Sequence, residues 1–195
     1  MICIAGNMPI IEVGHYQVSD YDTHWIRKAI QNAAERANQP QFLFVDDVYD
    51  GIVYYLENKC PLRLLQLDAL YDRIRHTLKR IGFETIANAL KVESPAVTIS
   101  LERAAVEAGN GYELAFYQIL KKEMAELKDL GAEEVFFSHI RDSILILRQD
   151  KTWSDSCDQL EKDILLWFKK AGTQPQQQGY RIRCSLKKIK VCCVM

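Results

Sequence analysis

The stretch PIIEVGHYQVSDYDTHWIRKAI, residues 9–30, decides the fold of the first half of this chain. β-Branched and aromatic residues lie on both sides of Gly14, which is typical of two short strands joined by a tight turn. Asp22 follows, just before an apolar-periodic segment, where a carboxylate can accept the free backbone N–H groups of a first helical turn. The stretch therefore predicts a β-hairpin and then a helix that begins after Asp22.

Helical periodicity continues beyond this stretch. One helix is expected to end near Ala37, a second to begin near Asp46-Asp47 and a third to end at Gly82, a residue that favours helix C-termini. The third helix has the clearest one-sided apolar spacing, formed by Leu67, Leu70, Tyr71, Ile74, Leu78 and Ile81. A short fourth helix completes a hairpin-and-helix module over residues 9–92.

A second module is expected after Pro95. Residues 96–172 contain a long amphipathic helix, a predicted strand at residues 134–137 and an apolar segment at residues 140–147 that fits either a strand or a helix. Residues 173–195 form a polar, Gln-rich linker and a basic C-terminal strand or tail. The predicted fold class is α+β and predominantly helical: an N-terminal β-hairpin followed by a helical bundle, and a second helical unit with one or two strands.

Composition and charge limit the function classes. The chain has 195 residues, of which 48% are hydrophobic and 26% charged, as in soluble globular proteins. Its formal net charge is -1, and no apolar run approaches the roughly 18 residues that span a bilayer. The six cysteines form no CxxC pair, so no zinc site is predicted. We expect a cytoplasmic protein with no nucleic-acid partner and no metal site.

Several residues of the first module form a characteristic series. Gly14 fits the hairpin turn, Tyr21-Asp22 an aromatic-Asp pair and Ile26 the start of the first helix. The series continues with Leu70-Tyr71-Asp72-Arg73-Ile74, Gly82 and Ile86-Ala87. Over roughly residues 9–90 the chain thus resembles the ATP-cone, a small nucleotide-binding regulatory module.

The resemblance implies a nucleotide site, with ATP or dATP as ligand, formed by Gly14, His15, Arg27 and Lys28. ATP-cones carry a Lys-Arg pair in the hairpin and a lysine at the helix start; Glu12 and Val13 replace the pair here, and Trp25 replaces the lysine. Polyphosphate binding needs cationic donors, which leaves Arg27 and Lys28 for that role. The leading prediction is a non-catalytic regulatory or binding protein with a degenerate ATP-cone-like module.

Self-association, or binding to a protein partner, is a further alternative. Trp25, Tyr54 and Tyr55 belong to residue types that favour interfaces, although ordinary core packing is an equal alternative for them.

The C-terminus suggests a second function. Cys192-Cys193-Val194-Met195 has the form of a farnesylation box, and five basic residues with no acidic one lie between Tyr180 and the end. Lipidation of Cys192 would make the protein a membrane-tethered adaptor, and a membrane is expected as a partner only in that case. The alternating pattern of residues 180–186 instead predicts a packed C-terminal strand.

An enzyme is the third alternative. His76 follows Asp72 by four residues, so one helix face could bring the two side chains together for acid–base chemistry. His139 lies just past a predicted strand and near Asp142. A surface helix pair is the favoured explanation of the first arrangement, and the sequence identifies no nucleophile for the second.

Overall fold

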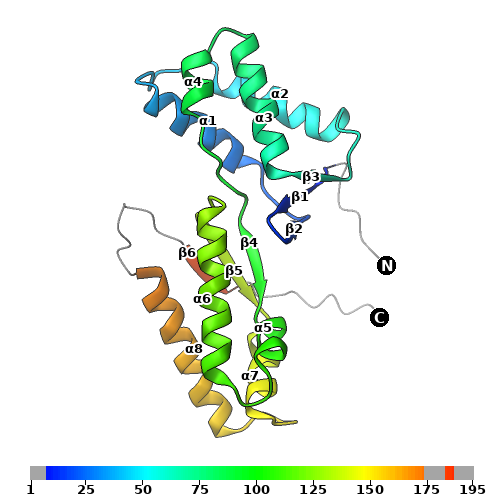
Figure 1. Cartoon of the computed structure of the whole chain (residues 1–195), viewed down its shortest axis with the longest axis vertical. Helices are drawn as coiled ribbons and strands as arrows, with labels where there is room; N and C mark the ends of the chain where they lie inside the picture. The colour runs from blue at the N-terminus through cyan, green and yellow to red at the C-terminus, as the bar shows by residue number, and fades with distance from the viewer. Residues whose placement is uncertain (1–7, 174–182, 187–195) are drawn as a thin grey trace. The chain divides into compact units, whose positions relative to one another are not determined.

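The computed structural model describes residues 8–173 and 183–186, and the chain divides into two compact units, residues 1–95 and 96–195 (Figure 1). Both units combine helices with a small sheet. The predicted α+β, predominantly helical fold class is confirmed, as is the order of a hairpin followed by helices. No helix among the described residues has both the length and the apolar character needed to cross a membrane.

A three-stranded mixed sheet opens the first unit. It consists of β1 (Ile10–Val13), β2 (Tyr16–Val18) and β3 (Leu64–Gln66), with β1 in the centre, antiparallel to β2 and parallel to β3. Gly14 adopts φ +59° at the first position of the two-residue turn, as a type II′ hairpin requires. The hairpin was predicted and β3 was not, because three residues carry too short an apolar pattern to reveal a strand that pairs with a distant segment.

Four helices follow the hairpin: α1 (His24–Arg36), α2 (Val45–Asn58), α3 (Leu67–Arg80) and α4 (Glu84–Ala89). The Asp22 carboxylate accepts a hydrogen bond of 2.8 Å from the backbone N–H of His24, which is the role predicted for it. Gly82 adopts φ +92° after α3, and its N–H donates to the Lys79 carbonyl. The next N–H, from Phe83, donates to the Leu78 carbonyl, which completes a Schellman motif and turns the chain toward α4.

The core of the first unit lies between the sheet and these helices. Its fully buried side chains include Ile11 and Val13 of β1, Ile26 and Ile30 of α1, and Ile86 of α4. α3 contributes most of the inward stripe that the sequence predicted, with Leu67, Leu70, Tyr71, Ile74 and Leu78 all buried. Ile81, predicted as its last member, lies just after the end of α3 and is 44% exposed. Only one face of α3 is used in this way, so the opposite face stays open to solvent.

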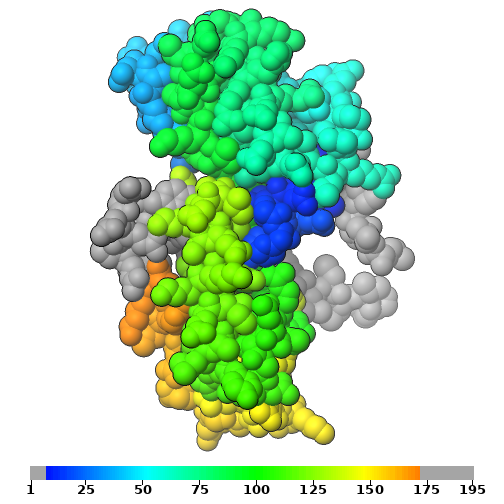
Figure 2. All heavy atoms as spheres, viewed as in Figure 1, coloured from blue at the N-terminus to red at the C-terminus, as the bar shows by residue number. Residues whose placement is uncertain are grey.

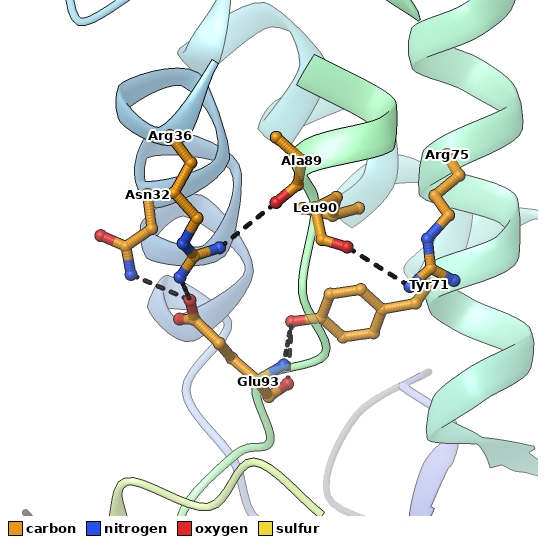
Figure 3. Close-up of polar contacts among 7 residues, drawn as sticks. All are labelled: Asn32, Arg36, Tyr71, Arg75, Ala89, Leu90 and Glu93. Carbon is orange, nitrogen blue, oxygen red and sulfur yellow. Dashed lines mark hydrogen bonds and ion pairs between the residues drawn. The ribbon is translucent and has the colours of Figure 1, made fainter. Parts of the chain in front are cut away.

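Tyr71 of α3 forms hydrogen bonds with the backbone of Glu93, near the end of the first unit (Figure 3). Its hydroxyl donates to the Glu93 carbonyl at 2.8 Å and accepts from the Glu93 backbone N–H at 2.9 Å. Burial raises the pKa of the Tyr71 phenol far above its usual range, which keeps the hydroxyl neutral and able to do both. One side chain therefore satisfies both polar groups of a buried peptide segment.

The Glu93 side chain connects the same segment to α1. Its carboxylate accepts from Asn32 Nδ2 at 2.9 Å and from Arg36 Nη2 at 3.3 Å. The Glu93 side chain is only 10% exposed, so this ion pair is shielded from water more than a surface pair would be. In Figure 3, Arg36 also reaches the Ala89 carbonyl at the end of α4.

Replacing Tyr71 by phenylalanine should destabilise the first unit by about 1–3 kcal/mol, because it leaves the buried N–H and C=O of Glu93 without their partner. Urea unfolding followed by circular dichroism measures this. Tyr54→Phe is the matched control, since Tyr54 is 57% exposed and its hydroxyl has no hydrogen bond among the described residues. An equal loss in both variants would contradict the role given to Tyr71.

The second unit contains a parallel sheet in the order β4-β5-β6, formed by β4 (Val97–Ser100), β5 (Glu134–Ser138) and β6 (Arg183–Leu186). β5 was predicted, and β6 lies within the segment for which a C-terminal strand was the alternative to a lipidated tail. β4 was not predicted. The Ser100 that ends β4 also caps the next helix, its Oγ accepting from the Arg103 N–H at 3.3 Å.

Two helices connect each pair of neighbouring strands: α5 (Leu101–Ala108) and α6 (Glu113–Asp129), then α7 (Ile140–Arg148) and α8 (Asp155–Thr173). The ambiguous apolar segment is thus the helix α7. Figure 1 shows α6 and α8 running alongside the sheet, and the Tyr117 and Trp167 rings of these helices meet with centroids 5.6 Å apart. Parallel strands need such long crossovers, which explains why helices dominate this unit.

Candidate functional site

A groove of about 980 Å³ lies between α2 and α3 of the first unit. Its α2 wall consists of Phe44, Asp47, Val48, Gly51, Ile52 and Tyr55. These positions recur every three or four residues over three helical turns, so they form one continuous helix face. In Figure 2 the teal and green spheres of α3 and α4 cover much of the visible face of this unit, with the cyan spheres of α2 beside them.

The facing wall is the side of α3 that the core does not use. It consists of Ala69, Arg73, His76, Thr77 and Arg80, and Ile81 and Phe83 close one end of the groove. Val48 and Ile52 are buried and form an apolar floor, whereas Phe44 and Ile81 remain 49% and 44% exposed. The site thus combines an apolar floor with a wall of basic side chains.

The two helices run in opposite directions along the groove. At one end the rings of Phe44 and Phe83 have centroids 5.6 Å apart, and at the other the Arg73 guanidinium carbon lies 4.0 Å above the Tyr55 ring. Burial raises the pKa of the Tyr55 phenol, and the neighbouring Cys60 adds to that effect. Tyr55 is therefore a neutral hydrogen-bonding group beneath a cation.

Charges of opposite sign lie on the two walls. α2 carries Asp46, Asp47, Asp50 and Glu57 and no basic residue. Asp46 is paired with Arg27, and of these acids Asp47 lines the groove. Asp47 forms no ion pair or hydrogen bond within the described part of the chain, and Arg80 across the groove forms none either. These charged groups are available to a ligand.

Gly51 lies in the middle of the α2 wall. A Cβ atom built there would meet no heavy atom within 4 Å, so the missing side chain widens the groove. Glycine inside a helix costs roughly 0.5–1 kcal/mol relative to alanine because it loses more backbone entropy on folding. A glycine in the middle of an amphipathic helix was the sequence signal that could have pointed to this site.

The nucleotide-site residues implied by the ATP-cone resemblance lie elsewhere. Gly14 and His15 form the hairpin turn, and the His15 ring lies beside Tyr16 with centroids 4.0 Å apart. Arg27 donates from Nε to Asp46 Oδ1 of α2 at 2.7 Å, which raises the pKa of Arg27 and lowers that of Asp46. Lys28 is exposed on α1.

The three residues that depart from the ATP-cone pattern are part of the fold, and Val13 is fully buried in the core. Glu12 lies on the central strand β1, in register with Gln17 and Gln66 of its neighbours. Trp25 packs against Tyr71, with ring centroids 6.1 Å apart, and its indole N–H is buried without a hydrogen-bond partner in the described part of the chain. Trp25 is thus part of the packing around α3 in this unit.

Among the described residues, neither His76 nor His139 forms a hydrogen bond with the aspartate near it in the sequence. Asp72 accepts from Arg75 Nη1 at 2.9 Å, and no contact between Asp72 and His76 is formed. His139, in a left-handed conformation between β5 and α7, makes its hydrogen bond to Ser138 Oγ at 3.0 Å. That serine was not predicted; it is buried and its hydroxyl donates to the Ile99 carbonyl at 3.4 Å, so it is not presented to a substrate.

The remaining sequence candidates do not add a site. Cys192, the predicted lipidation residue, lies outside the described residues, and its modification stays a prediction. Among residues 8–173 and 183–186, no group of three or more His, Cys, Asp and Glu side chains is arranged to hold a metal ion.

Comparison with known proteins gave no match: no protein-family model, no curated protein and no solved structure is significantly similar to this chain. The interpretation of the groove therefore depends on its own chemistry.

Replacing Gly51 by alanine should stabilise the first unit by about 0.5–1 kcal/mol, because the added methyl meets only open space and the helix loses its most flexible residue. Thermal or urea unfolding of the full chain measures the change. Gly82→Ala is the control: at φ +92° an alanine is strained, so that variant should lose stability. A loss with Gly51→Ala would contradict the open geometry of the groove.

Proposed function

We propose that this protein is a non-catalytic binding protein, that its N-terminal unit is the binding module and that the α2–α3 groove is the binding site. The observation that carries this proposal is the combination of an apolar floor with charged walls whose Asp47 and Arg80 have no partner among the described residues. A volume of about 980 Å³ is at the upper end of the range for small-molecule sites.

A binding role is favoured over catalysis by the way the titratable groups are arranged. The Asp72 carboxylate is held by Arg75, which leaves His76 without an orienting acid. Acid–base catalysis needs a base positioned within hydrogen-bond reach of a second group or of the substrate. Although Asp47 and His76 line the groove, they form no hydrogen bond with each other among the described residues. Cations above an apolar floor suit binding of an anion that has an apolar part.

Adenine nucleotides are the second, more specific proposal. The resemblance to the ATP-cone supports ATP or dATP as the ligand, and the side chains that line the groove have matching chemistry. Phe44 and Phe83 offer ring faces on which a base can stack, and Arg73, His76 and Arg80 offer positive charge to phosphates. The hairpin site is the less favoured location, because Arg27 is already neutralised by Asp46.

Thermal unfolding in the presence of ATP, dATP and inorganic tripolyphosphate tests both proposals. A ligand at 100 times its Kd adds about 2.7 kcal/mol to the free energy of unfolding, so a nucleotide that binds shifts the melting temperature upward. Arg80→Glu should reduce the affinity at least tenfold, because it places a repelling carboxylate on the α3 wall.

Two variants locate the site. Gly51→Trp fills the groove from a position where the side chain has open space, and it should abolish the shift while leaving the fold intact. Arg27→Glu alters the hairpin-side residue and should leave the shift in place. Loss of binding in Arg27→Glu with retention in Gly51→Trp would place the ligand at the hairpin and contradict the groove assignment.

A further inference from the structure

We propose that the α2–α3 groove binds a second copy of this chain, with α2 of each copy lying over α3 of the other. This inference rests on the proposed function of the groove as the binding site of the N-terminal unit, and it names the occupant. It is carried by the distribution of charge across the groove and by the apolar side chains left open along it.

The groove is electrostatically self-complementary. The α2 wall presents Asp47, whereas the α3 wall presents Arg73, His76 and Arg80. In a two-fold dimer the same surface is used by both partners, so a face must be able to match itself. A two-fold axis that runs along the groove places the acidic wall of each copy over the basic wall of the other.

Asp47 and Arg80 also lie at matching positions along the length of the groove. Because α2 and α3 are antiparallel, with Phe44 beside Phe83 and Tyr55 beneath Arg73, Asp47 lies at about the same level along the groove as Arg80. Rotation about an axis parallel to the groove preserves this level. Asp47 of one copy therefore faces Arg80 of the other, and the pair occurs twice.

The apolar side chains favour the same arrangement. Phe44 and Ile81, which line the groove, are 49% and 44% exposed. Under the two-fold rotation, Phe44 of each copy comes over the end of the groove that holds Ile81 of the other. Gly51, which lacks a side chain at the centre, allows the two helical layers to approach closely.

The size of the surface sets the expected affinity. Its lining runs over 12 residues on each side, from Phe44 to Tyr55 and from Ala69 to Arg80, or about 16 Å, and two helices side by side are about 20 Å wide. The pairing thus covers roughly 300–400 Å² per copy, which is small compared with the about 800 Å² per partner of a stable complex. The dimer is accordingly weak and reversible, with dissociation expected in the range of tens to hundreds of micromolar.

Sedimentation equilibrium of the full chain, from about 5 to 500 µM in low salt, tests the inference. Wild-type protein should show a reversible monomer–dimer equilibrium that weakens as salt is added, because exposed charge pairs are screened. Two charge-reversed variants, Asp47→Lys and Arg73→Glu/Arg80→Glu, should each dimerise at least tenfold more weakly. Mixing them in equal amounts should restore dimers, since each then meets an opposite wall on the other.

Lys91→Glu/Lys151→Glu provides a matched control. It makes the same charge change as the arginine variant at two exposed residues outside the groove lining that form no ion pair among the described residues, and it should leave the equilibrium unchanged. Circular dichroism and thermal unfolding of each variant separate loss of dimer from loss of fold.

Three results would overturn the inference: wild-type protein that stays monomeric up to 500 µM, reversed variants that dimerise as well as wild type, or a mixture that fails to recover. Monomeric protein whose groove still binds ATP or dATP would refute the second copy but leave the groove as a binding site. Monomeric protein whose melting temperature no nucleotide changes would remove the support for both.

Discussion

The contact between Tyr71 and the backbone of Glu93 fixes the arrangement of the N-terminal unit. The Tyr71 hydroxyl forms hydrogen bonds of 2.8 and 2.9 Å with the buried backbone C=O and N–H of Glu93. The Glu93 carboxylate in turn accepts hydrogen bonds from Asn32 and Arg36 of α1. Glu93 thereby joins α3 to α1, and Arg36 of α1 also donates to the Ala89 carbonyl at the end of α4. Leaving these groups unpaired in the interior would cost more than the hydrogen bonds gain, so the geometry is strongly specified.

This constraint explains why a groove exists beside α3. With Tyr71, Ile74 and Leu78 held inward, the helix turns its other face, bearing Arg73, His76 and Arg80, toward α2. The basic residues near the C-terminus of α3 also interact favourably with its helix dipole, so their positions have a structural as well as a functional explanation. Charge on α2 follows the same rule, since Asp46 and Asp47 occupy its first turn. The N-terminus of α2 lies beside the C-terminus of α3. Helix dipoles favour acidic residues at the first and basic residues at the second, which explains the opposite charges of the two walls at this end.

Resemblance and structure place the candidate site differently. The residues implied by the ATP-cone pattern lie on the hairpin and on α1, where Arg27 is engaged by Asp46. The positions that interrupt the pattern are used in the fold, with Glu12 in the sheet and Trp25 against Tyr71. In the α2–α3 groove, by contrast, Asp47 and Arg80 have no partner among the described residues. Their charges are therefore available to a ligand, whereas that of Arg27 is not.

The sequence by itself determined the local elements whose signals are contiguous. Gly14 predicts the hairpin turn, Asp22 the start of α1 and Gly82 the end of α3, because each acts on backbone groups only a few residues away. The apolar stripe of α3 likewise revealed its buried face. β3 and β4 were missed, since a strand of three or four residues is defined by the partner it pairs with rather than by its own pattern. Only the tertiary structure brought α2 beside α3, paired Asp72 with Arg75 instead of His76 and left Gly51 facing open space. Such a site depends on which helix faces meet, and that is decided by packing around Tyr71 and Glu93 rather than by the spacing of residues along the chain.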